Sequence, residues 1–423
     1  QICSTALIFI MFYGGFGTNW NTARPVLKQS ICMSTLGVIF TALLTGLFCH
    51  YALGMSWLEG LLTGSVVGST DAASVFSILR SKKLNLKGGL ASLLEIESGS
   101  NDPVSYMMTI IILTIMSVSS DISLPWMIAK QLLFGFGIGF GVAFLSSKLL
   151  SRINFEINGM DAILVIGTAL FTYGFSSWLG GNGYLSVYIV GIVLGNSKIL
   201  HKTSLVHFFD GITWLMQIAI FFVLGLLAFP SKIPSVALPA ILISVFMIIV
   251  ARPVATFLIL SWFKTPVRQQ LLVSWSGLRG AASIVFAIFV MSSGVVIEHD
   301  IFHIVFFVAL FSVAVQGTLL PKIADKLGLV DKEDDSLVLK TFTDYQDDVD
   351  TKLLEVPVTE DDFYAGRLLR EANIPEEVLI VMIKRHGETI IPRGSTKIKV
   401  GDILVVSSES FERFKSGQLK PPQ

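Results

Sequence analysis

Long apolar segments dominate the first 330 residues and constrain the fold more than any other feature of the sequence. A helix that crosses the hydrocarbon core of a bilayer needs about 20 mostly apolar residues. Eleven stretches are candidates for such spans, at residues 2–16, 31–53, 57–79, 89–116, 125–149, 161–179, 184–200, 209–229, 235–263, 271–296 and 301–320. The chain is 15% charged, whereas soluble domains carry about 25% charged residues. This composition excludes an ordinary soluble enzyme, a nucleic-acid-binding protein and a disordered chain.

The distribution of lysine and arginine predicts how these spans are oriented. Fourteen such residues fall in one alternating set of loops, and only Lys130 and Lys232 fall in the opposite set. Positively charged loops stay on the cytoplasmic side. We therefore expect a multi-pass protein of the cell membrane, with Gln1 outside and the C-terminal part in the cytoplasm.

The residues after position 330 follow a different pattern. Residues 331–351 are rich in acidic side chains and are expected to form a solvated linker. Residues 352–412 predict a small α+β domain, with strands at 353–358, 378–383, 388–391 and 403–406, a helix at 363–372 and a turn at His386-Gly387. A module this small is marginally stable alone, so we expect it to pair with a second copy.

The third apolar span contains small and polar residues where leucine and isoleucine would be expected. The run from Gly68 to Ser74 includes Thr70 and Asp71 near the middle of the span. Such a run interrupts a helix, and interrupted helices in transporters expose backbone groups beside the substrate site. Gly60, Gly64 and Gly68 could instead form only a packing face, but that alternative does not account for Asp71.

The fourth span carries a cluster of ionisable and polar side chains. Its members are Glu95, Glu97, Ser98, Asn101 and Asp102. Pro103 follows directly and has no N–H for the carbonyl group of Gly99, which leaves that oxygen free. Oxygen ligands of this kind suit a small hard cation. The alternatives are a structural polar network and a helix end that lies partly in water.

The tenth span is interrupted by glycines and contains a buried cation. Small and polar residues surround Arg279 between Ser274 and Ser283, and this span lies seven spans after the third span. An odd displacement inverts topology, as a pair of inverted repeats requires. We expect Arg279 to neutralise Glu97 and so to leave Asp102 free. A second intramembrane cation, Arg252, is either a side chain that reaches an interface or a functional group.

A buried carboxylate has a raised affinity for protons, and a dehydrated cation competes for the same charge. Asp102 could therefore hold a proton and a cation in turn, which predicts one-for-one exchange because Asn101 is neutral. Two alternatives stay open. One is an intramembrane aspartyl protease, in which Asp71 and Asp102 share a proton, although neither lies in a Gly-x-Gly-Asp motif. The other is a cation symporter or channel of similar fold.

Three motifs together resemble those of the NhaP-type monovalent cation/proton antiporters of the CPA1 family. They are Gly68-Ser69-Thr70-Asp71, Glu97-Ser98-Gly99-Ser100-Asn101-Asp102-Pro103 and Gly277-Leu278-Arg279-Gly280. The resemblance implies the sodium/proton antiporter fold, an all-α membrane domain with inverted repeats and crossed discontinuous helices. It also implies a homodimer of thirteen-span protomers, so that two N-terminal spans are expected to be missing here.

The same resemblance implies a role for each residue of the motifs. Asp102 would be the ion-binding and proton-exchanging carboxylate with Asn101 beside it, and Asp71, Ser98 and Thr70 would bind the cation. Glu97 and Arg279 would form a structural ion pair, and Glu95 and Arg252 are further candidates. Two departures affect the ligand set. Ala72 stands where relatives often have proline, and Gly14 to Asn19 contain no acidic residue.

The segment from Leu353 to Glu409 resembles the TrkA-C (RCK-C) regulatory domain. The resemblance rests on Gly366-Arg367-Leu368-Leu369, Ile391-Pro392-Arg393-Gly394-Ser395-Thr396 and Val400-Gly401-Asp402-Ile403-Leu404. Antiporters with such a tail belong to the potassium/proton branch, so the resemblance implies potassium first and sodium second. It further implies an unknown small ligand, of nucleotide type, for the tail. No cofactor and no nucleic-acid partner are expected.

Overall fold

The computed structural model describes residues 1–82, 84–117, 123–153, 159–331, 352–359, 362, 364–372, 374, 378–385 and 388–408. The chain divides into two compact units, Gln1–Val330 and Asp331–Gln423. Each unit is described by itself. Most of the predicted acidic linker, residues 332–351, lies outside the described residues.

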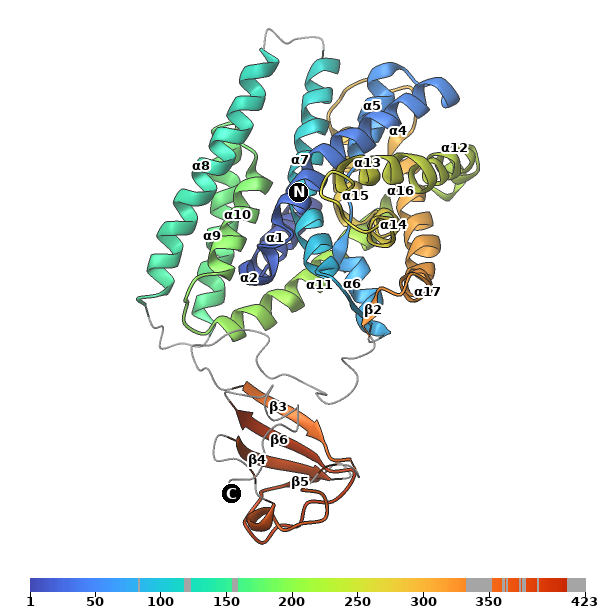
Figure 1. Cartoon of the computed structure of the whole chain (residues 1–423). Helices are drawn as coiled ribbons and strands as arrows, with labels where there is room; N and C mark the ends of the chain where they lie inside the picture. The colour runs from blue at the N-terminus through green and yellow to red at the C-terminus, as the bar shows by residue number, and fades with distance from the viewer. Residues whose placement is uncertain are drawn as a thin grey trace. The chain divides into compact units, whose positions relative to one another are not determined.

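The first unit is built of helices (Figure 1). They are α1 (Ile2–Phe16), α2 (Trp20–Ala23), α3 (Leu27–Cys32), α4 (Val38–Leu53), α5 (Trp57–Val66), α6 (Ala72–Ser81), α7 (Leu90–Met116), α8 (Leu124–Leu150), α9 (Met160–Trp178), α10 (Gly183–Gly195), α11 (Lys202–Leu227), α12 (Ile233–Phe246), α13 (Arg252–Leu260), α14 (Val267–Trp275), α15 (Ala281–Ser292), α16 (Ile301–Phe311) and α17 (Thr318–Lys326). Short π-helical segments η1 (Met33–Gly37), η3 (Met247–Ala251) and η4 (Ser312–Gly317) join α3 to α4, α12 to α13 and α16 to α17, and η2 (Pro230–Lys232) is a 3₁₀ turn. Two short strands, β1 (Asn85–Leu86) and β2 (Val330–Asp331), complete the list.

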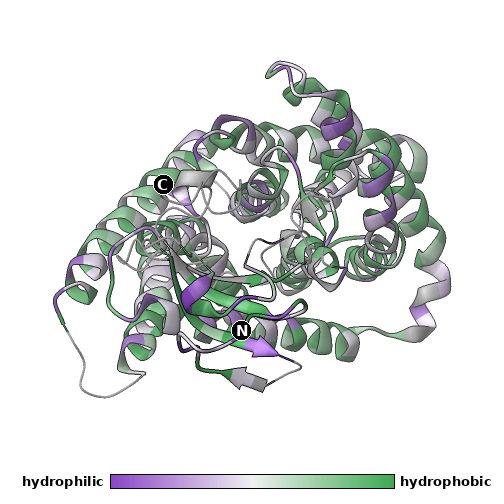
Figure 2. Ribbon diagram, turned by 60° about the horizontal axis from the view of Figure 1, so that its bottom comes forward, coloured by the Kyte–Doolittle hydropathy of each residue, from purple (hydrophilic) through white to green (hydrophobic). Residues whose placement is uncertain are grey.

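Six helices of the described chain are long and apolar enough to cross a membrane. They cover Leu27–Leu53, Leu124–Leu150, Met160–Trp178, Lys202–Leu227, Pro234–Leu260 and Ile301–Lys326. Three shorter helices, α1, α10 and α15, are also apolar. Figure 2 shows hydrophobic residues along most of the helices. Large apolar side chains such as Phe144 and Trp178 are 72% and 78% exposed, as expected of surfaces that face lipid.

Both helices that were predicted to be interrupted are divided in two. The predicted span at 57–79 forms α5 and α6 with a non-helical segment between them, and the span at 271–296 forms α14 and α15. In contrast, Pro103 does not end its helix, because α7 runs without a break from Leu90 to Met116.

Some glycines of the interrupted span serve close packing, as the alternative interpretation held. A Cβ on Gly60 would lie 2.7 Å from the carbonyl oxygen of Gly46, and one on Gly64 would lie 2.2 Å from that of Ala42. These distances are below van der Waals contact, so α5 can approach α4 this closely only where both positions are glycine.

The second unit contains a four-stranded antiparallel sheet in the order β3-β6-β4-β5. Its strands are β3 (Lys352–Pro357), β4 (Val378–Arg385), β5 (Glu388–Ile390) and β6 (Ile403–Ser408), which confirms the four predicted strands to within a few residues. Buried apolar side chains from β4, β6 and the connecting segments, such as Ile383, Leu404 and Tyr364, form its core. The predicted turn at His386-Gly387 lies outside the described residues.

The predicted helix at residues 363–372 is wrong. The described part of this segment forms turns and one 3₁₀ turn, η6 (Leu369–Glu371). Some of its backbone N–H groups bond to a distant segment, since Gly366 N donates to Ile398 O at 2.9 Å and Leu369 N donates to Thr396 O at 2.9 Å. A helix would have to give up these bonds.

Candidate ion-exchange site

The breaks in the two interrupted helices meet inside the first unit. Between α5 and α6, the backbone N–H of Asp71 donates to the carbonyl oxygen of Leu278, which lies between α14 and α15, at 2.8 Å. Gly280 is required at this crossing, because a Cβ there would lie 2.0 Å from a carboxylate oxygen of Asp71. The small residues of both breaks therefore let two backbones approach and bond each other directly.

Arg279 binds the backbone of the break that follows α5. Its Nη1 donates to the carbonyl oxygens of Gly68 at 2.8 Å and Ser69 at 2.7 Å, and its side chain is buried. These oxygens follow the C-terminal end of α5, where the negative end of the helix dipole lies. A guanidinium group at this place supplies both the donors and the opposing charge.

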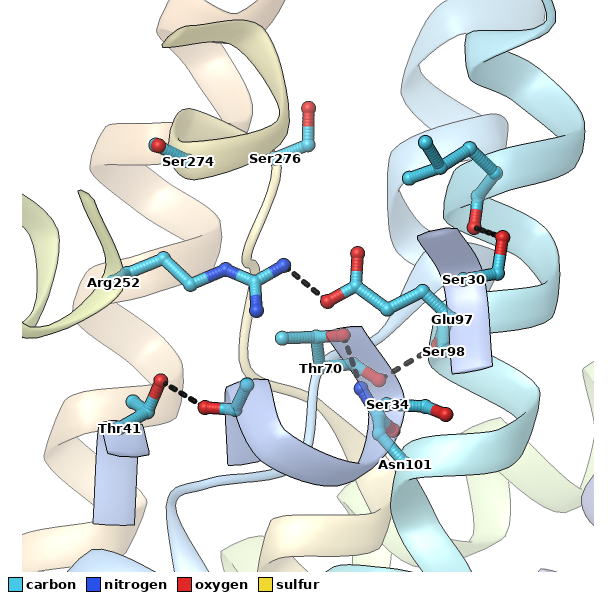
Figure 3. Close-up of polar contacts among 12 residues, drawn as sticks. Ser30, Ser34, Thr41, Thr70, Glu97, Ser98, Asn101, Arg252, Ser274 and Ser276 are labelled. Atoms are coloured by element: carbon cyan, nitrogen blue, oxygen red, sulfur yellow. Dashed lines mark hydrogen bonds and ion pairs between the residues drawn. The ribbon is translucent and has the colours of Figure 1, made fainter. Parts of the chain in front are cut away.

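Glu97 pairs with Arg252, so the predicted pair of Glu97 with Arg279 is wrong. Nη2 of Arg252 donates to Oε1 of Glu97, and both side chains are buried (Figure 3). Gly277 leaves room for this arginine, because a Cβ there would lie 2.9 Å from Nε of Arg252. Of the two interpretations of Arg252, the structure therefore excludes a side chain that reaches toward an interface.

Asp71 caps the start of α6. One carboxylate oxygen accepts from the backbone N–H of Ser74 at 3.2 Å, and the other accepts from the Ser74 hydroxyl at 2.6 Å. An aspartate in this position satisfies a free N–H of the first helical turn and opposes the positive end of the helix. Asp71 thus has a structural use at the crossing, which the sequence pattern did not indicate.

Ser98 and Asn101 of α7 both reach Thr70 in the first break (Figure 3). The Ser98 hydroxyl donates to the Thr70 carbonyl oxygen at 2.7 Å, and the Asn101 side-chain amide donates to the Thr70 hydroxyl at 2.5 Å. Among the described residues, the amide oxygen of Asn101 is buried and has no hydrogen-bond partner. A polar oxygen that is left bare in a buried site is available to a cation.

Asp102 is buried, with 5% of its surface exposed. Its carboxylate accepts a hydrogen bond from the hydroxyl of Ser69, the residue next to Thr70. Within the described part of the chain, no basic side chain forms an ion pair with it, whereas Glu97 has Arg252. Asp102 is neither exposed to bulk solvent nor held by a guanidinium group. The contact with Ser69 was missed, although Ser69 belongs to the small polar run that marked the break.

No contact among the described residues joins Glu95 to Thr70. The Glu95 side chain is half-buried, and a Cβ on Gly17, at the end of α1, would lie 3.7 Å from its carboxylate oxygen. The predicted site residues therefore divide into two groups. Asp102, Asn101, Ser98, Thr70 and Asp71 gather at the crossing, and Glu95 faces the end of α1.

A group of possible metal ligands occurs elsewhere in the described residues. Ligand atoms of Glu59, Glu298 and His299 lie within 4.8 Å of one another. The two oxygens of Glu59 already accept bonds, from the backbone N–H of Glu298 at 2.6 Å and from the His299 ring at 3.0 Å. These bonds fasten α5 to the segment before α16, and we assign no metal to the group.

Comparison with known proteins agrees with this geometry. Residues 2–326 match the family model for the transmembrane sodium/hydrogen exchanger, and residues 353–415 match the TrkA-C domain. The chain is 36% identical to the K(+)/H(+) antiporter NhaP2 of Shewanella sp. (strain ANA-3), over 96% of this chain and 71% of that protein. It is 26% identical to the Na(+)/H(+) antiporter ApNhaP of Aphanothece halophytica, over 76% of this chain and 63% of that protein.

A solved structure shows the same fold. The sodium proton antiporter MjNhaP1 from Methanocaldococcus jannaschii superposes with a TM-score of 0.70 at 24% identity, and the match covers 77% of this chain and 85% of that one. Nothing in these comparisons supports the protease or the symporter and channel alternatives. The chain belongs to the sodium/hydrogen exchanger family and is a multi-pass monovalent cation/proton antiporter of the cell membrane, with a cytoplasmic C-terminal TrkA-C domain.

Proposed function

We propose that this antiporter exchanges potassium for protons and that Asp102 binds the two ions in turn. The observation that carries the proposal is the burial of Asp102 without a cationic partner in the described part of the chain. A buried charge that lacks a counter-ion is costly. The carboxylate is therefore stable only with a proton or with a bound cation, which makes the two ions compete for one site.

The other buried charges near the crossing support exchange of one ion for one ion. Glu97 is balanced by Arg252. Arg279 and Asp71 carry opposite charges at the same crossing. Arg279 donates to the carbonyl oxygen of Ser69, and the backbone N–H of Asp71 donates to the carbonyl oxygen of Leu278, the residue before Arg279. Asp102 is then the charge left over, and a single proton or a single potassium ion neutralises it. Asn101 beside it adds no charge, so the cycle is electrically silent.

The proposed cation ligands lie around Asp102 on two elements. Asn101 contributes its bare amide oxygen, and Thr70 contributes its carbonyl oxygen, which has a second lone pair besides the one used by Ser98. Ser98 fixes the direction of this carbonyl group. Asp71 takes part through its charge while it caps α6. Carboxylate, amide and carbonyl oxygens together form a site for a hard cation.

Potassium is preferred over sodium because the relatives at 33% to 36% identity are named K(+)/H(+) antiporters, while the relative named for sodium is 26% identical. The TrkA-C tail, residues 352–412 in our proposal, regulates transport through a small ligand of nucleotide type. It is joined by the linker at 331–351 to an eleven-span transport domain at 1–330, and two protomers form a homodimer in the bilayer.

The proposal is tested by Asp102→Asn in proteoliposomes, with proton movement followed by a pH-sensitive dye after a potassium or a sodium gradient is imposed. We expect the variant to lose exchange with both ions while it still inserts in the membrane. The matched control is Asp161→Asn, because Asp161 is also buried but pairs with His201 at 3.0 Å. Exchange at the wild-type rate in Asp102→Asn would refute the assignment.

The role of the tail is tested by removing it after Asp331. We expect exchange to continue and its dependence on pH and on added nucleotides to change. If the full and shortened chains respond identically, the tail does not regulate transport.

A further inference from the structure

One face of α7 places Asp102 between two points of contact with α10. Residues 95, 99, 102 and 106 follow each other at intervals of four, three and four, so they line one stripe of the helix. The stripe reads Glu95, Gly99, Asp102 and Tyr106. Gly99 is thus the one position of this stripe without a side chain, and it lies one turn from the buried carboxylate.

The ring of Tyr188 from α10 fills the space at Gly99. A Cβ on Gly99 would lie 2.6 Å from Cε2 and 2.9 Å from the hydroxyl oxygen of Tyr188. The hydroxyl of Ser100 also donates to the Tyr188 hydroxyl at 3.2 Å, and Tyr188 is only 3% exposed. An aromatic ring from α10 therefore packs on α7 at the position of the stripe between Glu95 and Asp102.

A second aromatic contact lies on the other side of Asp102. Tyr106 packs edge to face on Tyr184 of α10, with ring centroids 4.9 Å apart at 82°. It also contacts Phe286 of α15, at 5.9 Å between centroids. Higher residue numbers on α7 meet lower ones on α10, so the two helices are antiparallel, and Tyr188 and Tyr184 lie one turn apart on the same face of α10.

We infer that Tyr188 is the cytoplasmic gate of the exchange site and that Tyr106 with Tyr184 closes the opposite side. Glu95 precedes Tyr188 on the way from the cytoplasmic end of α7, where its half-buried carboxylate attracts cations to the closed entrance. Tyr188 does not bind the ion. It acts as a positioning residue, because its ring must leave Gly99 and Ser100 before an ion from the cytoplasm can reach Asp102.

Loss of a gate has an effect that loss of a packing residue does not have. A gate prevents the site from being open to both sides of the membrane at the same time, so its loss uncouples the two ions. Tyr188→Ala leaves the cytoplasmic entrance open while the outer contact opens in each cycle. We expect potassium then to move without a matching proton, which produces a membrane potential in vesicles where the wild type produces none. Tyr188→Phe keeps the ring and should stay coupled.

The experiment follows a pH-sensitive dye and a voltage-sensitive dye in the same potassium-loaded proteoliposomes. The control is Tyr13→Ala, which removes a tyrosine that bonds Asp210 of α11 at 3.0 Å and should stay coupled. A second variant uses the close contact. Gly99→Ala should slow exchange, because its methyl group collides with the ring, and Tyr188→Ala in the same chain should restore ion movement in uncoupled form.

This inference rests on the proposed role of Asp102, and the outcomes separate the two. If Tyr188→Ala keeps exchange coupled one for one, at whatever rate, while Asp102→Asn abolishes it, the gate is refuted and the ion site stands. If Gly99→Ala exchanges at the wild-type rate, the ring does not control access. A potential that appears in Tyr188→Ala and is absent in Tyr188→Phe and Tyr13→Ala supports the gate.

Discussion

Substitution of Arg252, the ion-pair partner of Glu97, gives the sharpest test of the packing at the crossing. Glu97 and Arg252 are 1% and 3% exposed, respectively, so each depends on the other for its counter-charge. Arg252→Met removes the guanidinium group and keeps an apolar stem of similar length. It leaves the Glu97 carboxylate buried and unpaired, which costs about 3 to 5 kcal/mol in the free energy of unfolding.

Replacing both partners should be much less damaging than replacing one. Glu97→Gln with Arg252→Met leaves no unpaired charge, and neutral replacement of a buried pair is often tolerated. We therefore expect a coupling free energy of about 2 to 3 kcal/mol between these positions, at the upper end for residues in direct contact. The pair Glu97→Gln with Arg279→Met should couple by less, because Arg279 bonds the carbonyl groups of Gly68 and Ser69 instead.

The assay is a double-mutant cycle on purified protein, with unfolding followed by circular dichroism as sodium dodecyl sulfate is added to mixed micelles. Both cycles share Glu97→Gln, so each serves as the control for the other. Equal coupling in the two cycles, or stronger coupling with Arg279, would refute the ion pair that the structure shows.

Three further predictions follow from single contacts. Asn101→Asp adds a second carboxylate beside the first, so exchange should generate a membrane potential in proteoliposomes; a silent cycle would contradict the charge argument. Gly280→Ala should abolish exchange, because its Cβ would lie 2.0 Å from the carboxylate that caps α6, whereas Gly137→Ala on α8 meets open space and should transport normally; equal activity would exclude the close approach. In the tail, Arg385→Met removes two bonds to Asp402, of 2.6 Å and 2.7 Å, and should expose β6 to hydrogen exchange through a loss of about 2 kcal/mol; unchanged protection would contradict this.

The same tail contact predicts a dependence on pH. Burial alone would raise the pKa of Asp402, but the hydrogen bonds and positive charges of Arg385 and Lys399 together hold this pKa below the usual value. A carboxyl group whose pKa is lowered by folding stabilises the fold above its usual pKa, and the gain is lost as the pH falls through the lowered value. Protection of β6 should therefore decline below about pH 4, and this decline should be weaker in Arg385→Met.

The sequence predicted the interrupted helices and the residues that meet at them, because helix interruption is a local property. Runs such as Gly68-Ser69-Thr70 disfavour a continuous helix whatever surrounds them, and a carboxylate in an apolar span is visible without any structure. The partner of Glu97 could not be predicted in this way. Arg279 binds backbone oxygens, and a sequence pattern of side chains cannot predict such contacts. Glu97 pairs instead with Arg252 on another helix.

The error in the tail has a related cause. Residues 364–372 have the composition of a short helix, but the N–H groups of Gly366, Leu369 and Arg370 bond residues 394–398, which are distant in the sequence. Such long-range bonds override local preference. The contact between Gly99 and Tyr188 could not be predicted from the sequence either, because Tyr188 belongs to another helix.

Proton release on cation binding tests the central claim most directly. Potassium chloride is added to purified protein in weakly buffered detergent solution at the pH of half-maximal exchange, and the pH is recorded against choline chloride as the control salt. We predict that potassium displaces protons from the wild type, that the amount saturates with potassium, and that Asp102→Asn releases none. Saturable potassium binding without proton release, or the same release from Asp102→Asn, would contradict competition of the two ions for one buried carboxylate.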